Sequence, residues 1–505
     1  MERGLCVPAF DRTAFFLSSA IIALVVLLAL HFGWLNDDAL NYLTLADHLT
    51  QHQGFSLRPS WGDHYWAVFP GGYPLVIASL KLILSCTAFT ASKIANGFFL
   101  IGSILIAARW LGIPLLIAAA LFLSADMLEI ASYSWSENAF IFAQIASLAA
   151  LMSYLESGKS TALFSYVAAL LLAISSRYIG GFMLAGYVLL QAWFFTINAY
   201  RRQRLTATLA ITFTGAVLFA LYLYANIRLT GYPTGMARLP AQESLLTLAL
   251  QFITQLFFSL WLLVPPLLLL FLGGARPSRV HIRNHPKALP PLLFGLFYLG
   301  LLFILRSYSY FEPFSSRLLT PGTVLVYLGL LRVACEAWLP QKPKIAKWHY
   351  TVFLAAAFLN LTIAYQDLLK HPLWIAESSM EKAEQRFHTC YDPLPDGSVL
   401  IAAGVGYNDP TVSWNVISPI FSSDRIFYAL IDNEEMTEQA FRVYLLHLRY
   451  KEKKPTGYWF DFSGFANAQA LHTALAQSPV NPALAVWIES HFKPRSIVPC
   501  HECSS

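Results

Sequence analysis

Two adjacent carboxylates, Asp37 and Asp38, directly follow the first long apolar stretch, in GWLNDDALNYLTLADHL at 33–49. A carboxylate held at a membrane face can act as a general base toward a hydroxyl group or as a ligand for a divalent cation. Adjacent residues on a helix point about 100° apart, so we expect the two carboxylates to have different roles. The alternative is that both charges only mark the end of a membrane span.

Three more charged side chains stand close to the ends of apolar runs, and their types suit an anionic substrate: Glu137, Arg177 and Arg317. A guanidinium can bind phosphate oxygens through two parallel hydrogen bonds, which makes both arginines candidate phosphate ligands. The ordinary alternatives are a snorkelling or helix-end arginine and, for Glu137, a charge favoured by the helix dipole.

The composition is that of a polytopic membrane protein. Of 505 residues, 56% are hydrophobic and 12% are charged, whereas soluble proteins carry about 25% charged residues. Apolar runs of about 20 residues recur, which is the length that crosses the hydrocarbon core as a helix. The net charge of +5 is small and the basic residues are spread over short loops, so nucleic-acid binding is not expected.

The placement of Lys and Arg predicts the topology, because basic loops stay on the cytoplasmic side. The basic loops all fall on the cytoplasmic side only if the segment 72–85 does not cross the membrane. This segment is short and carries Lys81, so we predict that it is an interfacial helix on the outer surface. The N-terminal apolar stretch is expected to be retained as the first span. The sequence thus predicts an all-α polytopic membrane domain over 1–366 with about eleven spans, at 13–33, 91–110, 113–129, 137–156, 162–176, 180–197, 205–226, 245–272, 289–305, 317–334 and 350–366.

This topology places the candidate residues on the outer side of the cytoplasmic membrane, mainly in the long loop 34–90 and in 130–136, 175–179, 227–244 and 306–316. The same regions hold four side chains that we expect to line a substrate pocket: His64, Tyr65, Tyr73 and Tyr310. Aromatic residues there also suit an interfacial belt, and a loop histidine is more often only solvated. Lys81 can meet a lipid phosphate or merely anchor its helix.

Residues 367–505 are polar and predict a small extracytoplasmic α/β domain. The expected elements are strands at 398–405 and 425–432 and a helix at 437–454. Three cysteines, Cys390, Cys500 and Cys503, lie in this part of the chain. A disulfide or an incidental role is expected for them in an oxidising compartment, and the CxxC spacing is also compatible with metal or redox chemistry.

Several motifs together resemble a known family. The acidic pair, the PGGYPLVIASL segment, SYSWSENAFIFAQ at 132–144, ISSRYIGGFML at 174–184 and FSSRLLTPGTVLVYLGLL at 314–331 occur in the same order as in bacterial GT-C glycosyltransferases. The similarity is to the protein-mannosyltransferase and aminoarabinose-transferase type, and it covers most of 13–335. Leu318 stands where that family commonly has an aromatic residue.

The resemblance implies an enzyme that transfers a sugar from a polyprenyl-phosphate donor to an extracytoplasmic glycan, lipid or protein acceptor, with inversion. It implies that Asp37 or Asp38 is the base, that Glu137 supports the base or orients the acceptor, and that Arg177, Arg317 and Lys81 bind the donor phosphate. The sequence does not determine a cofactor, and Asp37 and Asp38 are a candidate site for a divalent cation.

Two other classes of protein remain open from the sequence. A transporter or flippase also carries charges within membrane helices, but here the charges cluster on one side and no internal repeat is evident. A noncatalytic assembly subunit could keep the fold without needing Asp37. The identity of the sugar and of the acceptor is not determined.

Overall fold

A computed structural model describes residues 37–56, 65–259 except five positions (198, 236, 237, 239 and 242), 289–309 and 313–338, three isolated positions (355, 359 and 362) and three C-terminal strands. The predicted first span at 13–33, nearly all of the last at 350–366, and the second half of 245–272 lie outside the described residues. The predicted helix 437–454 and the three C-terminal cysteines lie outside them as well.

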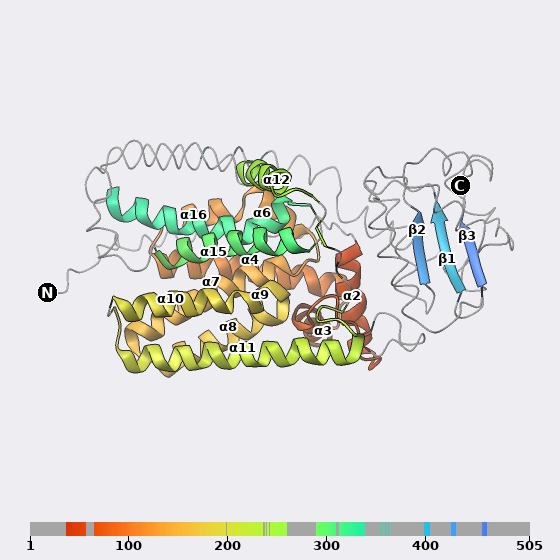
Figure 1. Ribbon diagram of the computed structural model, residues 1–505, viewed down its shortest axis with the longest axis horizontal. Helices are drawn as coiled ribbons and strands as arrows, with labels where there is room; N and C mark the ends of the chain where they lie inside the picture. Colours follow the sequence, from red (N-terminus) through yellow and green to blue (C-terminus); the bar gives the residue numbers. More distant parts are fainter. Residues whose placement is uncertain are drawn as a thin grey trace.

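Long helices run side by side along the long axis of the molecule (Figure 1). Within the described residues, five are long and apolar enough to cross a membrane: α4 (Ala88–Leu111), α7 (Glu137–Ser157), α9 with α10 (Tyr178–Phe182 and Leu184–Thr196), α11 (Arg202–Thr230) and α15 (Leu289–Tyr308). The bundle also contains α8 (Ser160–Ser176), α12 (Leu245–Phe258) and α16 (Ser316–Trp338).

Glycines end several of these helices. Gly112, Gly158 and Gly231 follow α4, α7 and α11 with φ values of 60°, 71° and 82°. This left-handed conformation is accessible to glycine without a steric penalty, and it terminates the helical hydrogen-bond pattern. The predicted spans at 91–110, 137–156 and 205–226 therefore correspond to helices with ends fixed by local sequence.

The predicted span at 113–129 is not one straight helix. The chain forms two helices there, α5 (Leu115–Phe122) and α6 (Ala125–Ser132), bent by 64°. Ser124 between them has an extended backbone, and Asp126 lies in the first turn of α6, where the helix dipole favours a negative charge. The break directs the end of α6 toward the segment 133–136, which leads into α7.

Two shorter helices, α2 (Asp37–Thr50) and α3 (Gly72–Leu84), lie at one end of the bundle (Figure 1). With 13 residues, α3 is too short to span a bilayer. Tyr73 and Ile77 pack in a core shared with α2 and α4, whereas Leu82 and Ile83 are 65% and 74% exposed. A short helix with one face packed in the protein and an apolar face exposed suits the predicted interfacial position.

The C-terminal strands form a three-stranded parallel sheet with the order β2-β1-β3. Two of them, β1 (Ser398–Ala403) and β2 (Ile426–Leu430), fall within the predicted strands 398–405 and 425–432, and β3 (Gly457–Asp461) was not predicted. Parallel neighbours require long crossover connections, so an α/β organisation of 367–505 remains the prediction for this part.

Candidate active site

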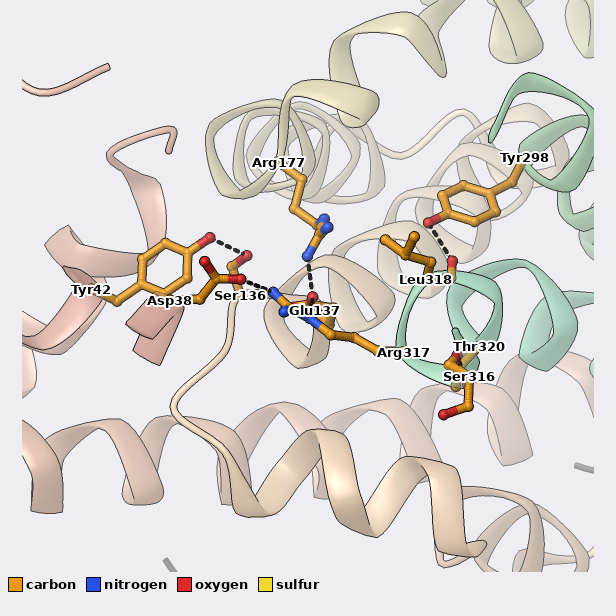
Figure 2. A network of polar contacts seen from close by, with 10 residues as sticks. All are labelled: Asp38, Tyr42, Ser136, Glu137, Arg177, Tyr298, Ser316, Arg317, Leu318 and Thr320. Atoms are coloured by element: carbon orange, nitrogen blue, oxygen red, sulfur yellow. Dashed lines mark hydrogen bonds and ion pairs between the residues drawn. The ribbon is translucent and has the colours of Figure 1, made fainter. Parts of the chain in front are cut away.

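Charged residues from four separate segments meet at the end of the bundle that carries α2 and α3 (Figure 2). Each lies at the start of a helix: Asp38 in the first turn of α2, Glu137 as the first residue of α7, Arg177 just before α9, and Arg317 in the first turn of α16. The structure thus brings together four of the side chains singled out from the sequence.

Glu137 is the centre of this network. Its side chain is fully buried, and its Oε1 atom contacts Nη1 of Arg177 and Nε of Arg317. Its second oxygen, Oε2, is buried and has no hydrogen-bond partner among the described residues. Two guanidiniums share one carboxylate, so Glu137 is better suited to hold the arginines together than to accept a proton.

Arg317 makes contacts in three directions. Besides Glu137, its Nη2 atom lies 2.6 Å from Oδ2 of Asp38, and its guanidinium carbon lies 4.1 Å from the ring centroid of Trp135. Trp135 is itself stacked on Tyr133, with 3.9 Å between the ring centroids. The aromatic ring adds a cation–π contact to the two ion pairs, which fixes the plane of the guanidinium.

Asp38 is the most accessible member of the network, with 30% of its side chain exposed, compared with 0% for Glu137. One turn further along α2, Tyr42 lies beside it and its hydroxyl group is 2.8 Å from Oγ of Ser136. Burial raises the pKa of Tyr42 above its ordinary value. Tyr42 therefore stays neutral and serves as a hydrogen-bonding group. Of the two carboxylates in the network, Asp38 is the more accessible one.

A tight corner places Arg177. The chain turns from α8 into α9 at this residue, which has an extended backbone. Three residues later, a Cβ atom on Gly180 would overlap the carbonyl group of Ala173, so only glycine permits this close return of the chain. The sequence SSRYIGG thus encodes the geometry that directs Arg177 toward α7.

Polar residues of α4 hold the segment that carries Trp135 and Ser136. Lys93 Nζ donates to the carbonyl oxygen of Ser132, and Asn96 Nδ2 donates to those of Ala131 and Tyr133 at 3.1 Å and 2.6 Å. These bonds satisfy carbonyl groups at the C-terminal end of α6 that have no partner within the helix. The broken helix pair is thereby connected to the start of α7.

Other residues singled out from the sequence lie outside this network. Lys81 Nζ is 2.5 Å from Oδ1 of Asp47, the hydroxyl of Tyr73 donates to Oδ1 of Asn96, and that of Tyr65 donates to Oδ1 of Asn226. His64 and Tyr310 lie outside the described residues, and Asp37 is described only as the first residue of α2. The role of Lys81 in donor binding stays a proposal, and its observed partner is a carboxylate.

The Lys81–Asp47 pair gives a prediction with a small expected effect. We expect Lys81→Met to lower the stability by about 1 kcal/mol or less, because both side chains are partly exposed, 24% and 28%, and such pairs contribute little. Thermal unfolding of the purified protein measures this. A large loss of lipid-phosphate affinity in the same variant would instead assign Lys81 to the binding site.

The contacts of five residues at the site were missed from the sequence: Tyr42, its hydrogen-bond partner Ser136, Trp135, and the supporting α4 residues Lys93 and Asn96. Tyr42 follows Asp38 by four residues, a spacing that places both on one face of a helix. Trp135 stands in the same short motif as Glu137. Nothing in the local pattern of α4 indicates which loop its polar residues hold.

The candidate cation site has limited support. In the part of the chain that the structure describes, no group of three or more His, Cys, Asp or Glu side chains is arranged to hold a metal ion. Asp38 is bound to Arg317, which satisfies its charge without a cation.

Fold and site together define a class: this is a multi-pass membrane protein with a carboxylate and arginine cluster at one end of its helix bundle. The fold is that of the aminoarabinose transferase ArnT, as the sequence resemblance implied. The chain is similar to ArnT from Cupriavidus metallidurans in the apo state, with a TM-score of 0.54 over 80% of this chain and 84% of that one at 13% identity. It is also similar to the same protein bound to undecaprenyl phosphate, with a TM-score of 0.52 over 81% and 85% at 12% identity. No protein-family model and no curated protein sequence matches the chain.

Proposed function

We propose that this protein is an integral-membrane glycosyltransferase that transfers a sugar from a polyprenyl-phosphate donor to an extracytoplasmic acceptor, with inversion. The observation that carries the proposal is the pair of arginines, Arg177 and Arg317, held on one buried carboxylate beside the accessible Asp38. The ArnT structure with bound undecaprenyl phosphate, which has the same fold, supports a lipid phosphate as the ligand.

The electrostatics of the site favour an anion. The helices α2, α7 and α16, with 14, 21 and 23 residues, all begin at the network. The N-terminal end of a helix carries a partial positive charge and free backbone N–H groups. Together with two guanidiniums, these helix ends provide a suitable environment for the phosphate of a leaving polyprenyl phosphate.

The reaction follows from this arrangement. The acceptor hydroxyl attacks the anomeric carbon of the donor, the bond between that carbon and the phosphate oxygen breaks, and the hydroxyl proton passes to Asp38. Arg177 and Arg317 stabilise the negative charge that develops on the phosphate. A single displacement from the face opposite the leaving group inverts the anomeric centre.

Donor binding also prepares the base in this proposal. Asp38 and Glu137 balance the charges of the two arginines, so the four side chains together are neutral. A phosphate that binds Arg317 competes with Asp38 for its Nη2 atom. The carboxylate is then released from its ion pair and becomes available to the acceptor hydroxyl.

Loss of Arg317 tests the phosphate site. We expect Arg317→Ala to weaken the binding of undecaprenyl phosphate by roughly 10- to 100-fold, since hydrogen bonds to a charged group contribute about 1.5–3 kcal/mol. Lipid binding to the protein in nanodiscs, measured by native mass spectrometry or with radiolabelled ligand, gives the affinity.

Arg228→Ala is the matched control, because it removes an exposed arginine from the last turn of α11. Equal losses of affinity in the two variants would point to general electrostatic attraction and contradict a specific site.

Reconstitution with radiolabelled polyprenyl-phosphate sugars then tests the transfer of the sugar itself. Tight lipid binding without transfer to any acceptor would favour a flippase or an assembly subunit.

A further inference from the structure

The first turn of α16 carries Arg317, and a proline weakens it. Pro321 lies inside this helix and has no N–H group with which to donate to the carbonyl oxygen of Arg317, the bond that any other residue there could form. Thr320 Oγ1 donates to the carbonyl oxygen of Ser316 at 2.8 Å, which supplies one local bond. The backbone N–H of Leu319 also donates to the carbonyl oxygen of Ser315 at 3.2 Å. Because the bond from position 321 is missing, a contact from outside α16 can add to the support of this turn.

Tyr298 of α15 provides such a contact. Its hydroxyl group donates to the carbonyl oxygen of Leu318 at 3.0 Å, and the side chain is 2% exposed (Figure 2). The two helices approach closely at this point, because a Cβ atom on Gly322 would lie 2.7 Å from Cδ1 of Tyr298. The tyrosine ring thus packs against the backbone of α16 itself, next to the residue that it bonds.

The orientation of this turn matters because Arg317 has three partners on separate segments. Its guanidinium must reach Asp38 of α2, Glu137 of α7 and Trp135 in the preceding loop at the same time. A rotation or shift of the α16 backbone would disturb all three contacts together. Small displacements of a charged ligand are costly when its geometry is fixed in several directions.

We infer that Tyr298 is a positioning residue for Arg317: its hydroxyl group holds the proline-interrupted first turn of α16 in the orientation in which Arg317 binds the donor phosphate. This inference rests on the proposed function for the identity of the ligand. The structural part of the inference, that Tyr298 supports the first turn of α16, applies with or without a bound ligand.

Tyr298→Phe tests the inference, with Tyr166→Phe as its matched control. Tyr166 is also a buried tyrosine whose hydroxyl group makes a hydrogen bond, 2.8 Å to Oγ1 of Thr212, between α8 and α11. Both variants lose one buried hydrogen bond, so we expect similar decreases in thermal stability. Only Tyr298→Phe is expected to weaken undecaprenyl phosphate binding, by roughly 3- to 10-fold. An unchanged affinity, or an equal loss in the control, would overturn the inference.

A second measurement needs no ligand. Amide hydrogen exchange in peptides covering 316–323 is expected to become faster in Tyr298→Phe and to stay as in the wild type in Tyr166→Phe. Unchanged exchange in Tyr298→Phe would refute the inference even if the wild type failed to bind lipid phosphate, a result that would refute the proposed function instead.

Pro321→Ala completes the test through a double-mutant cycle. The new N–H group can donate to the carbonyl oxygen of Arg317 and make the first turn self-supporting. In this background we expect Tyr298→Phe to accelerate exchange in 316–323 less than it does in the wild type, which gives a coupling between the two positions. Purely additive effects would show that the hydroxyl group does not act through this turn.

Discussion

Asp38→Asn is expected to reduce sugar transfer by about 10²- to 10⁴-fold, the contribution of a general base. Asparagine has nearly the same shape and keeps an oxygen that can accept a hydrogen bond from Arg317. It cannot take a proton from the acceptor hydroxyl. Transfer from a radiolabelled polyprenyl-phosphate sugar under single-turnover conditions measures the chemical step.

The same substitution should affect donor binding in the opposite direction. Asp38 lies 2.6 Å from Arg317 and competes with phosphate for that guanidinium. Without its charge, the remaining network of Glu137, Arg177 and Arg317 carries one net positive charge. We therefore expect Asp38→Asn to bind undecaprenyl phosphate at least as tightly as the wild type, while it fails to catalyse transfer.

Asp47→Asn provides the control for both measurements. Asp47 lies on the same helix, and it also forms an ion pair, 2.5 Å from Lys81. Its loss should change transfer only a few-fold, because this pair stands apart from the arginine cluster. If Asp38→Asn retained near-normal transfer, another group would have to be the base; if it lost lipid binding as well, the competition between Asp38 and phosphate would be ruled out.

Glu137→Gln is expected to have the largest effect on stability. The carboxylate is fully buried and contacts two guanidiniums, of which Arg177 and Arg317 are only 19% and 11% exposed. Removing one partner of a buried ion pair leaves uncompensated charge and costs about 3–5 kcal/mol. The midpoint of thermal unfolding in detergent should fall by several degrees. The affinity for lipid phosphate should also change, because Arg177 and Arg317 lose the carboxylate that both of them contact.

Glu243→Gln is the appropriate comparison. Glu243 forms an ion pair with Arg306, which is fully buried, at 2.5 Å. This variant should also lose stability, but its affinity for undecaprenyl phosphate should remain that of the wild type.

Bound phosphate can partly replace the missing carboxylate of Glu137→Gln, so the ligand should raise the unfolding midpoint of that variant more than that of the wild type. A Glu137→Gln protein as stable as the wild type would contradict the central position of this residue.

Local sequence accounts for much of the helical framework. The apolar runs predict the length of α4, α7 and α11, and the glycines at 112, 158 and 231 mark where these helices end, because helix length and termination are local properties. The break at Ser124 was not predicted, since the run 113–129 is apolar enough to read as one span. The break lies at Ser124, whose backbone is extended.

The amino-acid sequence was sufficient to show a membrane protein in which five charged residues are unusual: Asp37, Asp38, Glu137, Arg177 and Arg317. Charges are expensive near hydrocarbon, so the few that stand beside apolar runs are conspicuous without any structure. Their connections became visible only in the folded chain. Asp38 and Arg317 are 279 positions apart in the sequence yet form an ion pair, Lys81 pairs with Asp47, and the hydroxyl group of Tyr298 donates to the carbonyl oxygen of Leu318 beside Arg317. Such contacts arise from the packing of whole helices, and the periodicity of one segment contains no information about its distant partners.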